Sequence, residues 1–111
     1  MKTTFGEYLR QLRTDRGLTL TQLAAQLELD SANLSKIENG KRDFDEKRLE
    51  KLALTFNLDL KIIKTEFFSD LFAKKICENN CSIETLIIAE QKVHYRNNKK
   101  TRQTEIKFNK E

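Results

Sequence analysis

The chain has 111 residues, no proline, 38% hydrophobic and 34% charged residues, a length and composition that favour one all-helical domain with an appendage. It has no apolar run near the ~20 residues of a membrane span and no apolar N-terminal stretch like that of a signal peptide, so we expect a cytoplasmic protein with no membrane partner. Its net charge of +4 does not indicate a uniformly basic nucleic-acid binder, because residues 1–60 carry ten Lys/Arg and ten Asp/Glu while residues 97–111 carry five and two.

Four short helices with tight connections are expected in the first half of the chain, because apolar residues recur there at helical spacing. The expected ranges are 4–16, 20–27, 31–39 and 45–56. Thr19, with Gln22 three residues later, predicts a capping box at the start of the second helix, and Asp30 can cap the third. Gly17 and Gly40 follow the first and third helices, as C-terminal cap residues do. About three residues join the two central helices, which is the helix-turn-helix arrangement.

The second half of the chain is expected to hold two further helices and a tail. A wide apolar face predicts a helix over residues 59–79, but apolar residues also alternate near its start, so a short strand over residues 58–63 remains open. The next helix is expected to begin after Ser82 and to end near Arg96. Residues 97–111 are polar and basic, which predicts a flexible tail.

Two cysteines and one histidine limit the metal and catalytic chemistry that the chain can perform. Cys77 and Cys81 stand four residues apart, badly aimed for a disulfide on one helix face, so we expect free thiols in or near a helical core. His94 can complete neither a zinc site nor a nucleophile–base pair with them. We therefore expect no metal, no cofactor and no enzymatic activity.

A family resemblance rests on residues 16–42, RGLTLTQLAAQLELDSANLSKIENGKR, with FGEYLRQLR before them and LEKLALTFNLDL after them. The Leu-Thr-x-x-Gln-Leu-Ala start and the Leu-Ser-x-Ile-Glu-Asn-Gly-Lys-Arg end are specific as a spaced pair. Over about residues 4–60 the sequence resembles the Xre-type, phage-repressor-like helix-turn-helix regulators, and its extension looks like those of restriction-modification-associated controllers. The resemblance implies an all-α fold: a five-helix repressor-like helix-turn-helix DNA-binding domain over 1–60, a C-terminal helical extension for dimerisation over 61–96, and the flexible basic tail over 97–111.

The resemblance also implies a DNA-binding surface. The helix over residues 31–39 would enter the major groove, and the helix over residues 20–27 would lie across the DNA backbone. The positions that match base contacts are Ser31, Ala32, Asn33, Ser35 and Lys36. Those that match phosphate contacts are Thr19, Thr21, Gln22, Asn39, Lys41 and Arg42. Arg13 and Glu38 match a structural ion pair between the first helix and the reading helix.

The alternative for the helix over residues 31–39 is that its polar side chains form an ordinary solvent-exposed face with no binding role. A helix chosen for exposure would be richer in Glu, Lys and Ala, so the short polar side chains favour DNA contact. Two positions depart from the family pattern. Glu28 stands where the turn often carries glycine, which predicts a strained or differently shaped turn. Ser31 and Ala32 replace the usual glutamine or arginine, so base specificity must depend on Asn33, Lys36 and small side chains.

The apolar arc beyond residue 60 is wider than one neighbouring helix needs, which predicts an interface with a second copy of the chain. The expected interface residues are Phe67, Phe68, Leu71, Phe72, Ile76, Leu86 and Ile87. No small-molecule ligand is evident, although a pocket among the aromatic residues is an alternative.

We therefore expect a homodimeric, sequence-specific regulator of transcription, a repressor or a controller, that binds a partly palindromic operator in double-stranded DNA. The alternative is an antitoxin-type protein-interaction module that neutralises a toxin with its C-terminal helices and regulates its own operon.

Overall fold

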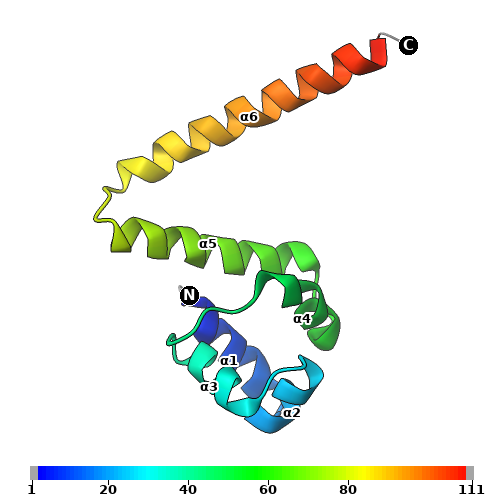
Figure 1. Ribbon diagram of the computed structural model, residues 1–111, viewed down its shortest axis with the longest axis vertical. Helices are drawn as coiled ribbons and strands as arrows, with labels where there is room; N and C mark the ends of the chain where they lie inside the picture. Colours follow the sequence, from blue (N-terminus) through cyan, green and yellow to red (C-terminus); the bar gives the residue numbers. More distant parts are fainter. Residues whose placement is uncertain (1–2, 110–111) are drawn as a thin grey trace. The chain divides into compact units, whose positions relative to one another are not determined.

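The computed structural model describes the backbone of residues 3–109 and the side chains of residues 3–100, and this part of the chain is built from helices and loops without strands (Figure 1). The helices are α1 (Phe5–Asp15), α2 (Leu20–Gln26), α3 (Ser31–Glu38), α4 (Leu49–Phe56), α5 (Leu60–Glu78) and α6 (Glu84–Asn109), with a 3-10 turn η1 (Glu46–Arg48) before α4. The all-α prediction is confirmed. The chain divides into a first unit that ends at Phe72 and a second unit that begins at Ala73.

The helix ends of the first unit follow the predicted capping residues. The Thr19 hydroxyl accepts a hydrogen bond from the backbone N–H of Gln22 at 3.1 Å, and the Gln22 side chain accepts one from the Thr19 N–H at 2.8 Å. The Asp30 carboxylate accepts from the N–H of Asn33 at 2.7 Å. Gly17 and Gly40 take the left-handed conformation after α1 and α3, with φ of 66° and 75°. Side chains close in the sequence therefore set where these helices begin and end.

The core of the first unit joins apolar residues from all of its helices. Its fully buried large side chains are Leu9, Leu23, Leu27, Leu34, Leu49, Leu52 and Ile63. Phe44 adds a ring from the loop before η1, and its ring centroid lies 5.4 Å from that of Phe5. Residues of α1 through α5 thus enclose a single apolar centre, which fixes the position of α3.

The first half of α5 completes this core. Residues 60–63 are helical, so the open alternative of a strand over residues 58–63 is wrong. Phe67 packs edge-on against Phe5 with ring centroids 5.3 Å apart. Phe67 and its neighbour Phe68 are half-buried against the core of their own unit, which leaves less of each ring for the predicted interface with a second copy. The carboxylate of Asp70 accepts a hydrogen bond from the Phe5 N–H at 3.0 Å and so joins α5 to the start of α1.

The second unit contains the end of α5, a short connector and α6. Asn80 takes a left-handed conformation with φ of 54°, and the N–H of Cys81 returns to the Ile76 carbonyl at 3.0 Å, which closes α5. Cys77 and Cys81 are both exposed free thiols, so their predicted place in or near a core is wrong within this unit. The predicted helix end near Arg96 is also wrong, because α6 continues to Asn109. Residues 110 and 111 of the predicted tail lie outside the described residues.

Candidate nucleic-acid interface

The helix α3 presents a polar face and buries an apolar one. Leu34 and Ile37 are buried in the core. Ser31, Ala32 and Lys36, three of the predicted base-contacting residues, are exposed. Of the other two, Asn33 and Ser35 are half-buried at the edge of the same face. Small side chains at the start of α3 leave room for another surface to approach the helix closely.

Asn33 is held by contacts within the chain on both sides of its amide. Its Nδ2 group donates to the Asp30 carboxylate at 2.9 Å, and its Oδ1 accepts from the Arg42 guanidinium at 3.1 Å. A predicted base-contacting residue and a predicted phosphate-contacting residue are therefore joined directly. Any contact of Asn33 with a base has to share or replace the Arg42 hydrogen bond.

The predicted phosphate-contacting residues lie at the start of α2 and just beyond the end of α3. Thr19, Thr21 and Gln22 are all exposed, although the side chains of Thr19 and Gln22 already bond to each other's backbone in the capping box. Lys41 and Arg42 are exposed in the loop that follows Gly40. The structure thus leaves Thr21 and Lys41 as exposed polar side chains outside the capping box and the Asn33–Arg42 pair.

The turn between α2 and α3 is strained at Glu28, as predicted from the absence of the glycine that the family often has at this position. Glu28 has a φ of 59°, a left-handed conformation that costs a non-glycine residue roughly 1 kcal/mol. Its carboxylate forms an ion pair with Lys51 of α4. The hydrogen bond and positive charge of Lys51 hold the pKa of Glu28 below its usual value of 4.5. A contact to α4 therefore accompanies the strained turn.

The predicted ion pair between Arg13 and Glu38 is present and buried. The Glu38 side chain is only 2% exposed, and the Arg13 guanidinium donates a hydrogen bond to each of its carboxylate oxygens, at 2.8 and 3.0 Å. Arg13 also donates to the Leu18 carbonyl at 3.0 Å. The hydrogen bonds to Glu38 raise the pKa of Arg13 above its usual value. This bidentate pair joins the end of α3 to α1 and to the loop before α2.

Gly6 permits the close approach of α1 and α3 that this ion pair needs. A Cβ atom at position 6 would overlap the carbonyl oxygen of Ile37 and lie 2.9 Å from that of Glu38. The backbones of the two helices therefore touch at this point. Gly6 lies among the residues that carry the family resemblance, but its role could not be predicted from the sequence, because its neighbours Ile37 and Glu38 are 31 and 32 residues away in the chain.

Arg10 is a second cation at Glu38 that the sequence analysis missed. Its Nε lies 3.4 Å from a Glu38 oxygen, and its terminal N–H group donates to the Oδ1 of Asn39. Asn39 in turn donates from Nδ2 to the Ser35 carbonyl at 2.9 Å. The three-residue spacing of Arg10 and Arg13 on one helix face was the signal that could have revealed it.

The remaining predicted interface residues divide between the two units. In the first unit Leu71 is half-buried and Phe72 is 55% exposed; in the second, Ile76 is half-buried. Leu86 and Ile87 of α6 are 43% and 55% exposed. Ile83, Ile88, Val93 and Tyr95 are exposed as well. The described part of the second unit therefore leaves most of its apolar residues in contact with solvent.

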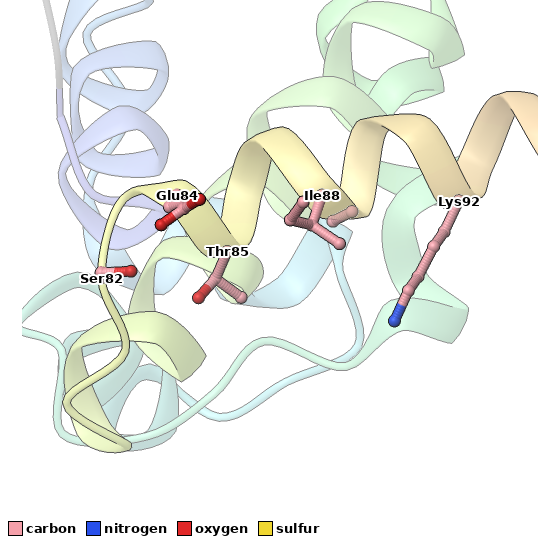
Figure 2. A pocket seen from close by; sticks show the side chains of 6 residues that line it. Ser82, Glu84, Thr85, Ile88 and Lys92 are labelled. Atoms are coloured by element: carbon pink, nitrogen blue, oxygen red, sulfur yellow. The ribbon is translucent and has the colours of Figure 1, made fainter.

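A surface depression lies beside the start of α6 (Figure 2). The described residues that line it are Ser82, Glu84, Thr85, Ile88, Ala89 and Lys92. In the close view the long side chain of Lys92 reaches further from the helix than those of Thr85 and Ile88. These groups do not include the aromatic residues where a pocket was considered from the sequence.

The described residues form neither a cluster of metal ligands nor a helix that could span a membrane. No three of their His, Cys, Asp or Glu side chains are placed to hold a metal ion together. None of their helices combines the length and the apolar character that crossing a membrane requires.

Comparison with known proteins places these features in a family. A family model described as a helix-turn-helix domain matches residues 6–76. The control protein C.MunI from Mycoplasma sp is 38% identical over 72 residues, which cover 64% of this chain and 92% of that protein. The HTH-type transcriptional repressor RghR from Bacillus subtilis (strain 168) is 54% identical over 39 residues, 35% of this chain. That match spans only 29% of the repressor's length.

The fold is similar to that of a solved regulator. The crystal structure of the clp gene regulator ClgR from Corynebacterium glutamicum aligns with a TM-score of 0.51 at 23% identity. The alignment covers 68% of this chain and 80% of that one. At this identity the likeness concerns the fold alone.

Proposed function

The chain belongs to the helix-turn-helix family of DNA-binding transcriptional regulators, and on this premise we propose that it binds a partly palindromic operator as a homodimer. In this role it acts as a repressor or as the controller of a small operon, in the cytoplasm where the DNA is.

One observation carries the DNA-reading part of the proposal: the exposed, small-residue face of a firmly anchored α3. Ser31, Ala32 and Lys36 face solvent while the opposite side of the helix is buried. The end of α3 is fixed by the buried Glu38 and its bidentate partner Arg13. A rigid helix with short side chains at its N-terminal end suits entry into the major groove, where such residues contact base edges.

Basic and polar groups beside α3 support a role at the DNA backbone. Lys41 and Arg42 follow the reading helix, and Thr21 is exposed at the start of α2. Basic and polar side chains on both sides of a helix in the major groove are placed to contact phosphates. Such contacts orient the protein on the DNA but do not distinguish one base sequence from another. The hydrogen bond from Arg42 to Asn33 would then join a phosphate contact to a base contact.

The exposed apolar residues of the second unit support pairing with a second copy. Leu86 and Val93 lie seven residues apart on one side of α6, Ile83 lies just before the helix, and all three remain exposed within one chain. A dimer that covers them would carry two α3 helices, and paired readers of this kind bind half-sites ~34 Å apart, one turn of the double helix. The two half-sites would be inverted copies of each other.

A second candidate function is supported by a separate observation on α6. Ile88 and Tyr95 are also exposed, and they stand seven residues apart on a side of the helix different from that of Leu86 and Val93. A dimer that covers one side leaves the other free for a protein partner, as an antitoxin would require. Isolation of the dimer with a stoichiometric toxin encoded in the same operon would favour this function.

The DNA-reading proposal is tested by replacing one predicted base contact and one predicted phosphate contact. Lys36→Ala should weaken binding to the selected operator by about 1–3 kcal/mol and leave random duplex binding nearly unchanged. Lys41→Ala, the matched control, should weaken both kinds of binding about equally. Equal losses on both DNAs for Lys36→Ala would remove Lys36 from the base-reading surface, and absence of any duplex binding by the wild type would reject the function.

A further inference from the structure

Arg10 carries a charge at the end of the reading helix that the ion pair with Glu38 does not require. Arg13 already donates hydrogen bonds to both carboxylate oxygens of Glu38, and its side chain is only 14% exposed. The Arg10 side chain is 45% exposed, and its contact with Glu38 is longer, at 3.4 Å. One carboxylate therefore faces two guanidinium groups, and the outer one is accessible to solvent.

Asn39 holds this outer guanidinium. Its Oδ1 accepts the hydrogen bond from Arg10, while its Nδ2 donates to the Ser35 carbonyl and so fixes the orientation of the amide. Both polar ends of the Asn39 side chain are thus engaged within the chain. The predicted phosphate contact of Asn39 is better explained as a contact made through Arg10.

The position of the guanidinium suits an anion. It is bonded to Asn39, the residue that caps the end of α3 and is followed by Gly40, Lys41 and Arg42. Among the described residues Arg10 donates hydrogen bonds to Glu38 and Asn39, whereas a guanidinium carries five N–H donors arranged as a fork that matches phosphate oxygens. Glu7, one turn earlier on α1, accepts a hydrogen bond from the Thr4 N–H at 2.9 Å and belongs to the helix cap.

We propose that Arg10 of α1 binds a phosphate of the DNA backbone, held in place by Glu38 and Asn39. This inference rests on the proposed function, since it assumes that α3 enters a DNA groove. It adds a contact from α1 to a surface otherwise formed by α2, α3 and the loop after α3.

The test is the salt dependence of binding to the operator and to a random duplex. Arg10→Gln keeps a hydrogen-bond donor but removes the charge, so we expect about tenfold weaker binding to both duplexes at ~0.1 M salt. The slope of log K against log salt should fall in magnitude by about 1. Arg10→Lys should restore the slope, and Arg10→Met should reproduce the loss if Arg10→Gln does not fold. Lys64→Met, which removes an exposed charge from α5, is the charge-matched control that should leave the slope unchanged.

A double-mutant cycle tests how Asn39 acts. Asn39→Ala should weaken DNA binding when Arg10 is present and have almost no effect in the Arg10→Gln background, because its role is to position that residue. Additive losses would show that Asn39 contacts DNA by itself and would overturn the positioning role.

Two failures are distinguishable. If the wild type binds the operator and the neutral Arg10 variants keep the full salt slope, Arg10 is only structural and this inference is wrong, while the proposed function stands. If the wild type shows no selective duplex binding, the proposed function and the phosphate site fail together.

Discussion

Helical spacing of apolar residues is found in both units, but only the first unit covers its own apolar residues. Leu9, Leu23 and Leu34 have no exposed surface, whereas Ile83, just before α6, and Ile87, on α6, are 71% and 55% exposed. The same pattern in the sequence therefore has two outcomes. In the first unit it builds a core that holds α3, and in the second it leaves exposed apolar residues, the kind of surface that partners bury.

The largest expected effect comes from removing the buried acid that anchors α3. Glu38→Ala strands Arg13 beside a buried apolar core, so we expect a loss of about 3 kcal/mol in the free energy of unfolding, measured with urea. The exposed pair of Lys74 and Glu78, 3.9 Å apart, is the comparison in the second unit. Glu78→Ala should cost less than about 0.5 kcal/mol, and equal costs for the two variants would contradict the contrast between the units.

The next effect tests the close approach of α1 and α3. Gly6→Ala places a methyl group against the carbonyl oxygens of Ile37 and Glu38, and we expect a loss of about 2 kcal/mol in stability. Gly17→Ala is the control, because nothing lies within 4 Å of its Cβ position and only its positive φ opposes the change, at about 1 kcal/mol. A Gly6→Ala variant as stable as the wild type would show that the helices can separate without cost.

The exposed residues of α6 should matter for association and not for folding. Leu86→Glu should raise the dimer dissociation constant at least tenfold, about 1.4 kcal/mol, because a charge would be buried between the copies. Sedimentation analysis measures this constant. Lys92→Glu introduces the same side chain beside the depression of Figure 2 and should have a smaller effect. A Leu86→Glu protein that sediments like the wild type would remove this side of α6 from the interface.

The smallest effect concerns the turn between α2 and α3. The pKa of Glu28 is lowered by Lys51, so the charged carboxylate stabilises the folded state above pH 4.5, and this contribution is lost as the pH falls through the lower pKa of the folded protein. The stability difference between wild type and Glu28→Gln should therefore be present at neutral pH and vanish in acid. Thermal unfolding of both proteins over pH 3–7 measures this stability difference. A difference that does not change with pH would exclude the ion pair as its cause.

Local chemistry explains what could be predicted from the sequence. The capping box of Thr19 and Gln22, the Asp30 cap and the left-handed Gly40 involve residues within a few positions of one another. The Arg13–Glu38 pair came from the family resemblance and is present in the structure.

Contacts between distant residues explain what was missed. Gly6, Arg10 and Phe44 gain their roles only when α1 packs against α3 and the loop before η1, and spacing along the chain does not show that packing. The continuation of α6 past Arg96 was missed because polar residues there offer no apolar stripe, although most of them are compatible with a helix.

Selection of bound sequences from a random pool of DNA duplexes tests the central claim most directly. It examines together the proposed recognition of DNA bases by the first unit and the proposed dimerisation through the second. The wild type should enrich two inverted half-sites whose centres lie about one helical turn apart, and Leu86→Glu should enrich them far less. A pool that stays random after selection with the wild type, or that yields only a single unsymmetrical site, would contradict the account.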